Sequence, residues 1–393
     1  MYKPLDGLRI LTIEQYGAGP YGTQLLAGLG AEVIKIETAE GGDSSRAAGP
    51  YFLGEDDSQF FQTFNRGKKS VCLDLKHADD RALFETLVKG ADAVANNLRG
   101  DLPARLKVDY AALKSIKPDI VCAHLSAYGR GGARETWPGY DYLMQSEAGF
   151  LSLTGEPDGP PARFGLSMVD FMTGTMMALG LVSAVLGARR TGEGCDVDVS
   201  LLDTALHQLS YPATWYLNEG AETTRLARSA HPSVMPSQLF PTEDGWIFLM
   251  CQLPKFWSVF CEAAGRADLA ADPRFADTNS RGDNRAALQD ELDALFRTRP
   301  TTHWVALLGG KVPVAPVYSL SEALDAPDAA GLIETVDHPD RPDGLKLLRE
   351  PFRINGERPS QARAPKLGEH TREVLDALGN GGNGGGGKDQ GAQ

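Results

Sequence analysis

The chain has 393 residues, of which 42% are hydrophobic, and its formal net charge is −13. Such a length leaves room for roughly two or three domains, and the hydrophobic content is enough for a sizeable core. The negative charge argues against nucleic acid or an anionic membrane surface as the main partner.

Strands and helices alternate in the first third of the chain. Apolar and β-branched runs predict strands at residues 8–13, 33–37, 70–75, 91–95 and 119–125. Helical spacing predicts helices at 23–30, 79–89 and 110–116. This alternation predicts a parallel, doubly wound α/β sheet.

The pattern changes after about Gly192. We expect a strand at 195–200, a helix at 201–217, a hairpin at 239–249 that turns at Asp244-Gly245, and a helix at 285–296. These elements indicate a second, smaller domain. A last helix begins near Leu367, and the Gly-rich segment 379–393 predicts a flexible tail.

The cysteines and the N-terminus indicate the compartment. Five cysteines occur without a C-x-x-C spacing, which predicts reduced thiols in the cytoplasm and no metal site. The first residues, MYKPLDGLRI, lack the shape of a signal peptide.

One carboxylate, Asp170, stands directly before a long uncharged run, FMTGTMMALGLVSAVLGA, at residues 171–188. We read this run as a buried helix rather than a membrane span. An acid at a helix N-terminus faces unpaired N–H groups and can stay ionised in a dry site, as a carboxylate nucleophile requires. The alternative is that Asp170 only caps the helix.

Gly17, Gly19 and Gly22 form a G-x-G-x-x-G between a predicted strand and a helix. Glu37 follows Gly17 by 20 residues, where a ribose-binding acid would stand in a dinucleotide-binding domain. Gln15 and Tyr16 make the turn longer than the fingerprint requires. An NAD(P)-dependent oxidoreductase and a plain strand-to-helix turn both remain open on this pattern.

Several segments, in order and spacing, resemble the class III CoA-transferase family (CaiB/BaiF), which includes formyl-CoA transferase and carnitine CoA-transferase. The resemblance covers about residues 5–378. The matching segments are PLDGLRIL (4–11), AGP (18–20), LGAEVIKIE (29–37), FNRGKKS (64–70), residues 155–174, TGEG (191–194), DVSLLD (198–203) and LGEH (367–370).

The resemblance implies a catalytic role for Asp170, because family members have their covalent nucleophile at this position. It also implies a Rossmann-like large domain built from both chain ends (1–200 and 330–378), an inserted small α+β domain (220–325) and linkers at 201–219 and 326–329. The implied assembly is an interlocked homodimer. Coenzyme A, as an acyl-CoA substrate, and a carboxylic acid are the expected partners, without metal, NAD, nucleic acid or membrane.

The same resemblance assigns CoA contacts residue by residue. The corresponding positions here are Gly17, Ala18, Thr38, Leu73, Asp74, Leu75, Lys76, Asn96, Asn97, Leu98, Arg105, Gly139, Tyr140 and Asp141. Arg105 and Lys76 could pair with CoA phosphates. Thr38 replaces a basic residue of formyl-CoA transferase, and Asn97 stands where an aromatic residue is common.

Two departures argue against an oxalate or formate enzyme. The glycine run that folds over the active-site acid of formyl-CoA transferase is replaced here by SAHPSVMP (229–236), and Gly17 replaces a side-chain amide. His231 and Ser233 are candidates for contacting the acceptor acid. Arg163, Arg225 and Arg228 are left open as partners of a distal carboxylate.

The runner-up inside the family is a 2-methylacyl-CoA racemase, which needs a histidine as acid or base. Its Gly-His-Asp motif corresponds here to Gly139-Tyr140-Asp141, and a tyrosine does not titrate near neutral pH. A CoA-binding relative without turnover is a further alternative, against which Asp170 speaks. The favoured donor is succinyl-CoA, with a dicarboxylate or hydroxy acid as acceptor.

Overall fold

The computed structural model describes residues 2–380. They form two compact units. The first contains the chain up to Ala148, Leu166–Gln208 and the chain from Gly331 on, and the second contains Gly149–Gly165 and Leu209–Ala330. The predicted tail lies outside the described residues, except that 379 and 380 end the last helix.

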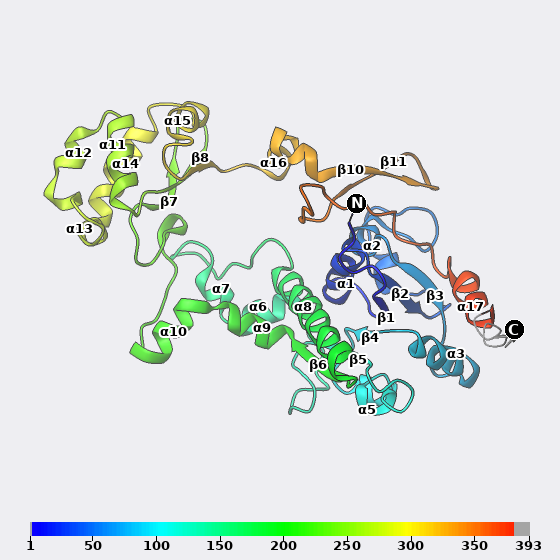
Figure 1. The fold of residues 1–393 in the computed structure, drawn as a ribbon. Helices are drawn as coiled ribbons and strands as arrows, with labels where there is room; N and C mark the ends of the chain where they lie inside the picture. Colours follow the sequence, from blue (N-terminus) through cyan, green and yellow to red (C-terminus); the bar gives the residue numbers. More distant parts are fainter. Residues whose placement is uncertain (1, 381–393) are drawn as a thin grey trace, which may run out of the picture. The chain divides into compact units, whose positions relative to one another are not determined.

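The first unit is built on a six-stranded sheet with the order β3-β2-β1-β4-β5-β6. All neighbouring strands pair in parallel (Figure 1). The strands are β1 (Arg9–Ile13), β2 (Glu32–Glu37), β3 (Lys69–Cys72), β4 (Ala93–Asn96), β5 (Val121–Ser126) and β6 (Cys195–Ser200). Their apolar and β-branched residues are mostly buried, as a sheet covered on both faces requires.

Helices cover both faces of this sheet. Helix α3 (Ala78–Lys89), α5 (Tyr110–Leu113) and α17 (Thr371–Asn380) contribute to an apolar cluster on one face. Helix α1 (Ala18–Gly28) and α8 (Met168–Thr191) cross closely and pack on the other face. The remaining elements are η1 (Ser44–Ala47), α2 (Gln59–Phe64), α4 (Leu102–Arg105), α6 (Asp141–Glu147), α9 (Leu201–Gln208) and the antiparallel hairpin β10 (Ile333–His338) and β11 (Arg341–Leu348).

The second unit has a three-stranded antiparallel sheet surrounded by short helices. Its apolar core contains Trp257, Phe260 and Phe296. The strands are β7 (Ser237–Pro241), β8 (Trp246–Met250) and β9 (Val314–Pro316). The helices are α7 (Phe150–Leu153), α10 (Ser210–Glu219), η2 (Ala227–Ser229), α11 (Pro254–Ala263), α12 (Ala267–Ala271), η3 (Pro273–Phe275), α13 (Thr278–Asp283), α14 (Arg285–Phe296), α15 (Thr301–Leu308) and α16 (Leu320–Asp325), and η4 (Pro327–Leu332) spans the change to the first unit.

Most predicted elements are present, and the hairpin turns at Asp244-Gly245 between β7 and β8. Several expectations were wrong in detail, among them the strand at 70–75, which ends at residue 72, and the last helix, which begins at residue 371 rather than near 367. The helix at 201–217 is two helices, α9 and α10, because Ser210 has a positive φ of 46°. The helix at 23–30 begins at Ala18 and ends at Gly28, and the helix at 110–116 ends at Leu113.

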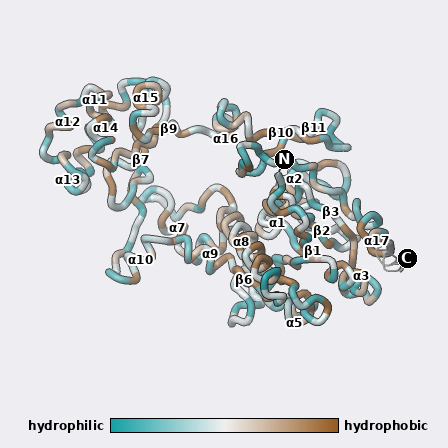
Figure 2. Tube along the Cα trace, viewed as in Figure 1, coloured by the Kyte–Doolittle hydropathy of each residue, from teal (hydrophilic) through white to brown (hydrophobic). Residues whose placement is uncertain are grey.

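The uncharged run forms α8, which is coloured as mainly apolar in Figure 2. It is buried on one side only, since Met176, Leu179 and Leu186 are exposed. Within residues 2–380 it is the one helix long and apolar enough to cross a membrane, which alone is weak evidence for such a role. In the fold it packs against α1, β5 and β6.

The strand order changes direction between β1 and its neighbour β4. In open parallel sheets, the loops that leave such a pair of strands diverge to opposite sides and leave a crevice at the carboxyl ends. This topology places a ligand site after Ile13, Asn96 and Ser126, where β1, β4 and β5 end.

Candidate active site

A cavity of about 540 Å³ opens at this switch point. The loops after β1, β4 and β5 form its walls, together with the segment before α6 and the first turn of α8. Its lining residues are Gln15, Tyr16, Gly17, Ala18, Ser44, Asn97, Leu98, Arg99, Leu102, Leu125, Ser126, Ala127, Trp137, Pro138, Gly139, Tyr140, Asp170 and Leu201.

Asp170 lies in the first turn of α8, as its third residue rather than directly before the helix as predicted. Its backbone N–H donates to Oδ2 of Asp141 over 3.0 Å. The buried Asp141 therefore caps α8 from the start of a different helix, α6. Through this contact two carboxylates lie close together at one helix end.

Burial raises the pKa of Asp170 to about 7, and the negative charge of Asp141 contributes in the same direction. This corrects the expectation that the helix N-terminus alone keeps Asp170 ionised, because desolvation and a like charge both favour the protonated acid. Ordinary aspartates titrate near 3.8, so Asp170 differs from them by a large margin. Perturbed acids in a cleft are candidates for reactive groups.

The beginning of α1 lies directly beside this carboxylate. A methyl group added at Gly17 would lie 3.4 Å from Oδ2 of Asp170. Within residues 2–380, no side chain caps the N-terminus of α1. The positive end of this helix therefore faces the cavity and favours an anion there.

The structure brings together at the cavity six of the predicted CoA contacts, namely Gly17, Ala18, Asn97, Leu98, Gly139 and Tyr140. The amide of Asn97 is occupied by the main chain of Gln15, which donates its N–H to Oδ1 over 2.8 Å and accepts from Nδ2 over 2.7 Å. Asn96 is fully buried in β4, and its Nδ2 lies 2.8 Å from Nδ1 of His124.

The other predicted CoA contacts lie outside the lining. Leu73 and Leu75 belong to the apolar cluster beneath α3, and Asp74 accepts a hydrogen bond from the N–H of Lys76. Thr38 donates to the carbonyl of Glu40, and Arg105 pairs with Asp101 at 3.2 Å. The roles of these residues in binding CoA stay predictions.

Sequence reasoning missed Arg99 and Trp137. Arg99 follows β4 by three residues, lines the cavity and pairs with Asp101 at 2.5 Å. Hydrogen bonds from Arg99 lower the pKa of Asp101 to about 2. The position of Arg99, just beyond the end of a strand at the switch point, could have identified it from the sequence. For the half-exposed Trp137 the sequence offers no signal except its nearness to Gly139.

His231 and Ser233 lie in the second unit, where they contact each other. Ser233 N–H donates to Nδ1 of His231 over 3.2 Å, and Nε2 of His231 lies 3.2 Å from the hydroxyl of Tyr211. Burial and the charge of Arg285 lower the pKa of His231. The imidazole is therefore mainly neutral near pH 7, and its contact with an acceptor acid stays a prediction.

The three arginines left open are also in the second unit. Arg225 donates to the carbonyl of Gly159, and Arg228 forms an ion pair with both oxygens of Asp293. Arg163 donates to the carbonyls of Phe164 and Gly165.

Glu37 does not fit the role of a ribose-binding acid. Its carboxylate is buried, and it accepts hydrogen bonds from Arg46 at 2.7 and 2.9 Å and from Ser70 at 2.6 Å. These bonds hold the pKa of Glu37 below its ordinary value despite burial. Among the described residues, no group of three or more His, Cys, Asp or Glu side chains could hold a metal ion.

Comparison with known proteins fits this geometry. The sequence model described as "CoA-transferase family III" matches residues 5–371. The chain is 35% identical to the acetyl-CoA:oxalate CoA-transferase of Acetobacter aceti, over 93% of each chain. It is 34% identical to the succinyl-CoA:mesaconate CoA-transferase of Haloarcula hispanica, over 95% of this chain and 96% of that protein.

Solved structures agree with the sequence comparison. The crystal structure of a CaiB/BaiF family protein from Brucella suis superposes with a TM-score of 0.83 at 31% identity, covering 96% of this chain and all of that one. The two chains therefore share not only sequence similarity but also the α/β fold with its parallel six-stranded sheet. The chain therefore belongs to CoA-transferase family III and is a CoA-transferase.

Proposed function

We propose that this enzyme transfers CoA from an acyl-CoA to a carboxylic acid through covalent intermediates on Asp170. The observation that carries the proposal is a partly buried carboxylate with a raised pKa at the cavity where β1 and β4 diverge. A carboxylate in such a place can attack a thioester directly, without a separate base.

The reaction keeps its atoms and bond energy in balance. The Asp170 carboxylate attacks the thioester carbonyl, which forms an acyl-aspartyl anhydride and expels CoA thiolate. The thiolate attacks the aspartyl carbonyl, which forms an aspartyl-CoA thioester and frees the donor acid. The acceptor carboxylate attacks that thioester, which forms an acceptor-aspartyl anhydride and expels the CoA thiolate. The thiolate then attacks the carbonyl of the acceptor, which gives the new acyl-CoA and frees Asp170.

Two features of the site support this chemistry. The raised pKa makes Asp170 a more basic nucleophile than an exposed aspartate, while a large fraction is still ionised at neutral pH. The uncapped N-terminus of α1 lies beside the carboxylate and would stabilise negative charge that develops on the attacked carbonyl oxygen.

We also propose that the cavity holds the acyl-CoA, with Arg99 near its phosphates. Arg99 lines the cavity, whereas Arg105 shares its partner Asp101 but lies outside the lining. Arg99→Ala is expected to raise the Kd for CoA about tenfold by loss of a charge-assisted contact. Arg105→Ala, at the arginine that the family resemblance assigns to the phosphates, is expected to have a smaller effect. An equal effect of both variants would contradict the placement of Arg99.

Dicarboxylates are the proposed acceptor class, with succinyl-CoA as the favoured donor. Relatives are named for oxalate, mesaconate and glutarate, and two of these three names pair with succinate or succinyl-CoA. The relative named for oxalate makes that acid a necessary member of any substrate panel. The departures at 229–236 and Gly17 predict that oxalate is a poor acceptor here.

The proposed function can be tested by mass spectrometry of the intact protein after mixing with succinyl-CoA. Hydroxylamine would convert an aspartyl thioester or anhydride into a hydroxamate at Asp170, and borohydride would reduce it to an alcohol. Adding each acid of a panel before the trapping step identifies the acceptor by loss of the adduct. No adduct with succinyl-, acetyl-, formyl- or aromatic acyl-CoA would favour the racemase or a non-catalytic CoA binder.

The interlocked homodimer, the insertion of a small domain into a large one, and the cytoplasmic location are further proposals from the family resemblance. The described units support the insertion, since the first unit combines both chain ends and the second lies between them in sequence. Light scattering after gel filtration is expected to give twice the 42.2 kDa chain mass. A mass of 42.2 kDa would contradict the dimer.

A further inference from the structure

The turn that joins β1 to α1 contains a strained residue. Tyr16 has a φ of 67°, in the left-handed region that residues other than glycine, asparagine and aspartate rarely occupy. The strain occurs one residue before Gly17, at the wall of the cavity. Such a conformation persists only where the surroundings determine it several times over.

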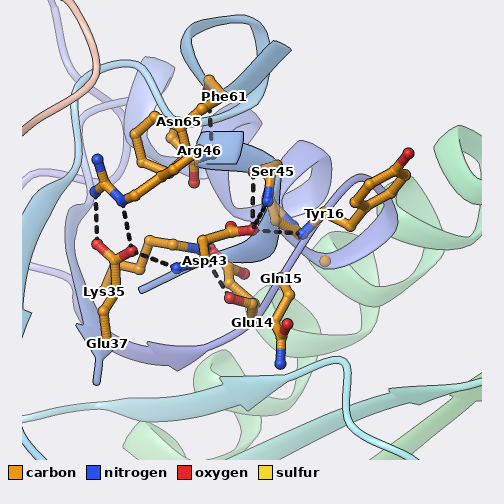
Figure 3. A network of polar contacts seen from close by, with 12 residues as sticks. Glu14, Gln15, Tyr16, Lys35, Glu37, Asp43, Ser45, Arg46, Phe61 and Asn65 are labelled. Carbon is orange, nitrogen blue, oxygen red and sulfur yellow. Dashed lines mark hydrogen bonds and ion pairs between the residues drawn. The ribbon is translucent and has the colours of Figure 1, made fainter. Parts of the chain in front are cut away.

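Four hydrogen bonds determine this turn, from three different parts of the fold. Nζ of Lys35 donates to the carbonyl of Glu14 over 2.8 Å. The amide of Asn97 binds both the N–H and the carbonyl of Gln15. The N–H of Tyr16 donates to Oδ1 of Asp43 over 3.0 Å, which is the one bond made by the strained residue's own amide (Figure 3).

Asp43 is itself held in place by contacts with Lys35, Ser45 and Glu37. Its Oδ2 lies 2.8 Å from Nζ of Lys35, and its Oδ1 also accepts hydrogen bonds from the N–H and the hydroxyl of Ser45, both at 2.8 Å. Its own N–H donates to Glu37 over 2.9 Å, and Glu37 in turn binds Arg46 (Figure 3).

These residues belong to a larger buried group of charges. Its members are Glu14, Lys35, Glu37, Asp43, Arg46 and Lys68, three acidic and three basic. Apolar residues of the same volume often give equal or greater stability than a buried ion pair. The group therefore suggests a role in fixing one conformation, and the strained turn is the part of it that reaches the cavity.

The position of this turn matters because α1 and α8 touch through their backbones. A methyl group added at Gly174 would lie 2.3 Å from the carbonyl oxygen of Ala18, so the two helices are already in closest contact there. The start of α1 is thus set by Gly174 on one side and by the turn at Tyr16 on the other. A shift of this turn would move Gly17 relative to Asp170.

We infer that Asp43 is a positioning residue for the transfer reaction. By binding the N–H of Tyr16, it holds the left-handed turn that sets Gly17 and the N-terminus of α1 against the Asp170 carboxylate. This inference rests on the proposed function of Asp170. It assigns no contact between Asp43 and the substrate.

The sharpest test uses the conformational preference of residue 16. Tyr16→Gly and Tyr16→Ala both remove the ring, but only glycine adopts the left-handed region without cost. Tyr16→Ala is expected to have about a tenfold lower kcat than Tyr16→Gly, because that conformation is unfavourable for L-residues. The KM for acyl-CoA is expected to be similar in the two, since the loss falls on the reacting geometry.

A rescue experiment connects this effect to Asp43. Asp43→Ala is expected to lower kcat, and adding Tyr16→Gly should restore more activity than adding Tyr16→Ala. Turnover is measured with the most active donor and acceptor of the panel, and thermal unfolding checks that each variant is folded. If Asp43→Ala does not fold, Asp43→Ser replaces it in both double variants, because the shorter side chain also loses the hydrogen bond to the N–H of residue 16.

The two levels of the proposal fail in different ways. A wild-type chain that transfers CoA without forming an adduct at Asp170 would overturn the proposed function. Equal turnover of the Tyr16→Gly and Tyr16→Ala variants, in a chain that does form the adduct, would overturn only the positioning role. The positioning role would also be overturned if Asp43→Ala combined with Tyr16→Gly were no more active than Asp43→Ala combined with Tyr16→Ala.

Discussion

Asp43 and Asp170 lie on either side of the same turn, yet their environments are opposite. Asp43 is buried with Lys35 at 2.8 Å and accepts hydrogen bonds from Tyr16 and Ser45. Burial would raise its pKa, but the charge of Lys35 and these bonds hold the pKa below the ordinary value. Burial also raises the pKa of Asp170, and the neighbouring charge of Asp141 adds to the rise.

The comparison shows that the partner of a buried carboxylate decides its role. A carboxylate beside a cation is stabilised as an anion and serves as a fixed acceptor of hydrogen bonds. A carboxylate beside another carboxylate is a poorly stabilised anion, and poor stabilisation is what makes it reactive. In this chain Asp43 serves structure, and Asp170 serves the proposed chemistry.

The largest effect is expected from removing the reactive carboxylate. Asp170→Ala should lower CoA transfer by at least about a thousandfold, because loss of the covalent route leaves only binding and electrostatics. The Kd for CoA should change little. Both are measured by steady-state transfer and calorimetric titration, and a variant that transfers CoA at the wild-type rate would refute the nucleophile assignment.

The second largest effect is expected in the free energy of unfolding, when Asp43 loses its ion-pair partner Lys35. Lys35→Met leaves Asp43 buried without its cation and is expected to cost about 3–5 kcal/mol in urea unfolding at pH 7.5. Lys69→Met is the matched control on the neighbouring strand β3, since Lys69 forms partly exposed ion pairs with Glu32 and Glu373. Its cost is expected to be about 0–1 kcal/mol. Similar costs for both lysines would break the contrast.

A third effect concerns pH. The proposed attack needs ionised Asp170, so the rate of adduct formation should rise as pH increases through about 7 and then level off. Asp141→Asn removes the like charge, so the inflection should move to lower pH. Glu147→Gln, at the other end of α6, is the control and should leave the inflection in place. An inflection that moves to higher pH in Asp141→Asn would contradict the assigned electrostatics.

The sequence predicted the sheet and the place of Asp170 at the start of a long helix more fully than the surroundings of Asp43 and Asp170. The apolar runs of β1, β2 and β5 and the uncharged run after Asp170 are local signals, and local signals suffice for strands and a long helix. Lys35 stands in the middle of β2, where an alternating pattern does not reveal that its partner is Asp43 from a later loop. The same limit applies to Glu37, because only the folded structure shows that its partners are Arg46 and Ser70.

The polar contacts near Asp170 depend on chain segments far apart in sequence. Asn97 was predicted to contact CoA, and the structure shows its amide bound to Gln15, 82 residues away. Asp141 was placed among the CoA contacts, and it caps α8 from 29 residues upstream. Motif resemblance gives the position of such residues, whereas their partners follow from the way β1, β4, α6 and α8 meet.

The smallest expected effect separates function from stability at Asp170 itself. Asp170→Asn keeps the shape but removes the poorly stabilised anion, so the variant should be more stable than the wild type by about 1 kcal/mol at pH 8. The carboxyl group has a folded pKa of about 7 and an ordinary value of 3.8. Its ionisation therefore penalises the folded state fully above pH 7, and the penalty declines as pH falls toward 4. Urea unfolding at pH 8 and pH 5 should show a gain that shrinks at the lower pH. A loss of stability at pH 8 would mean that the carboxylate is stabilised in the fold, as Asp43 is, and the contrast between the two acids would not hold.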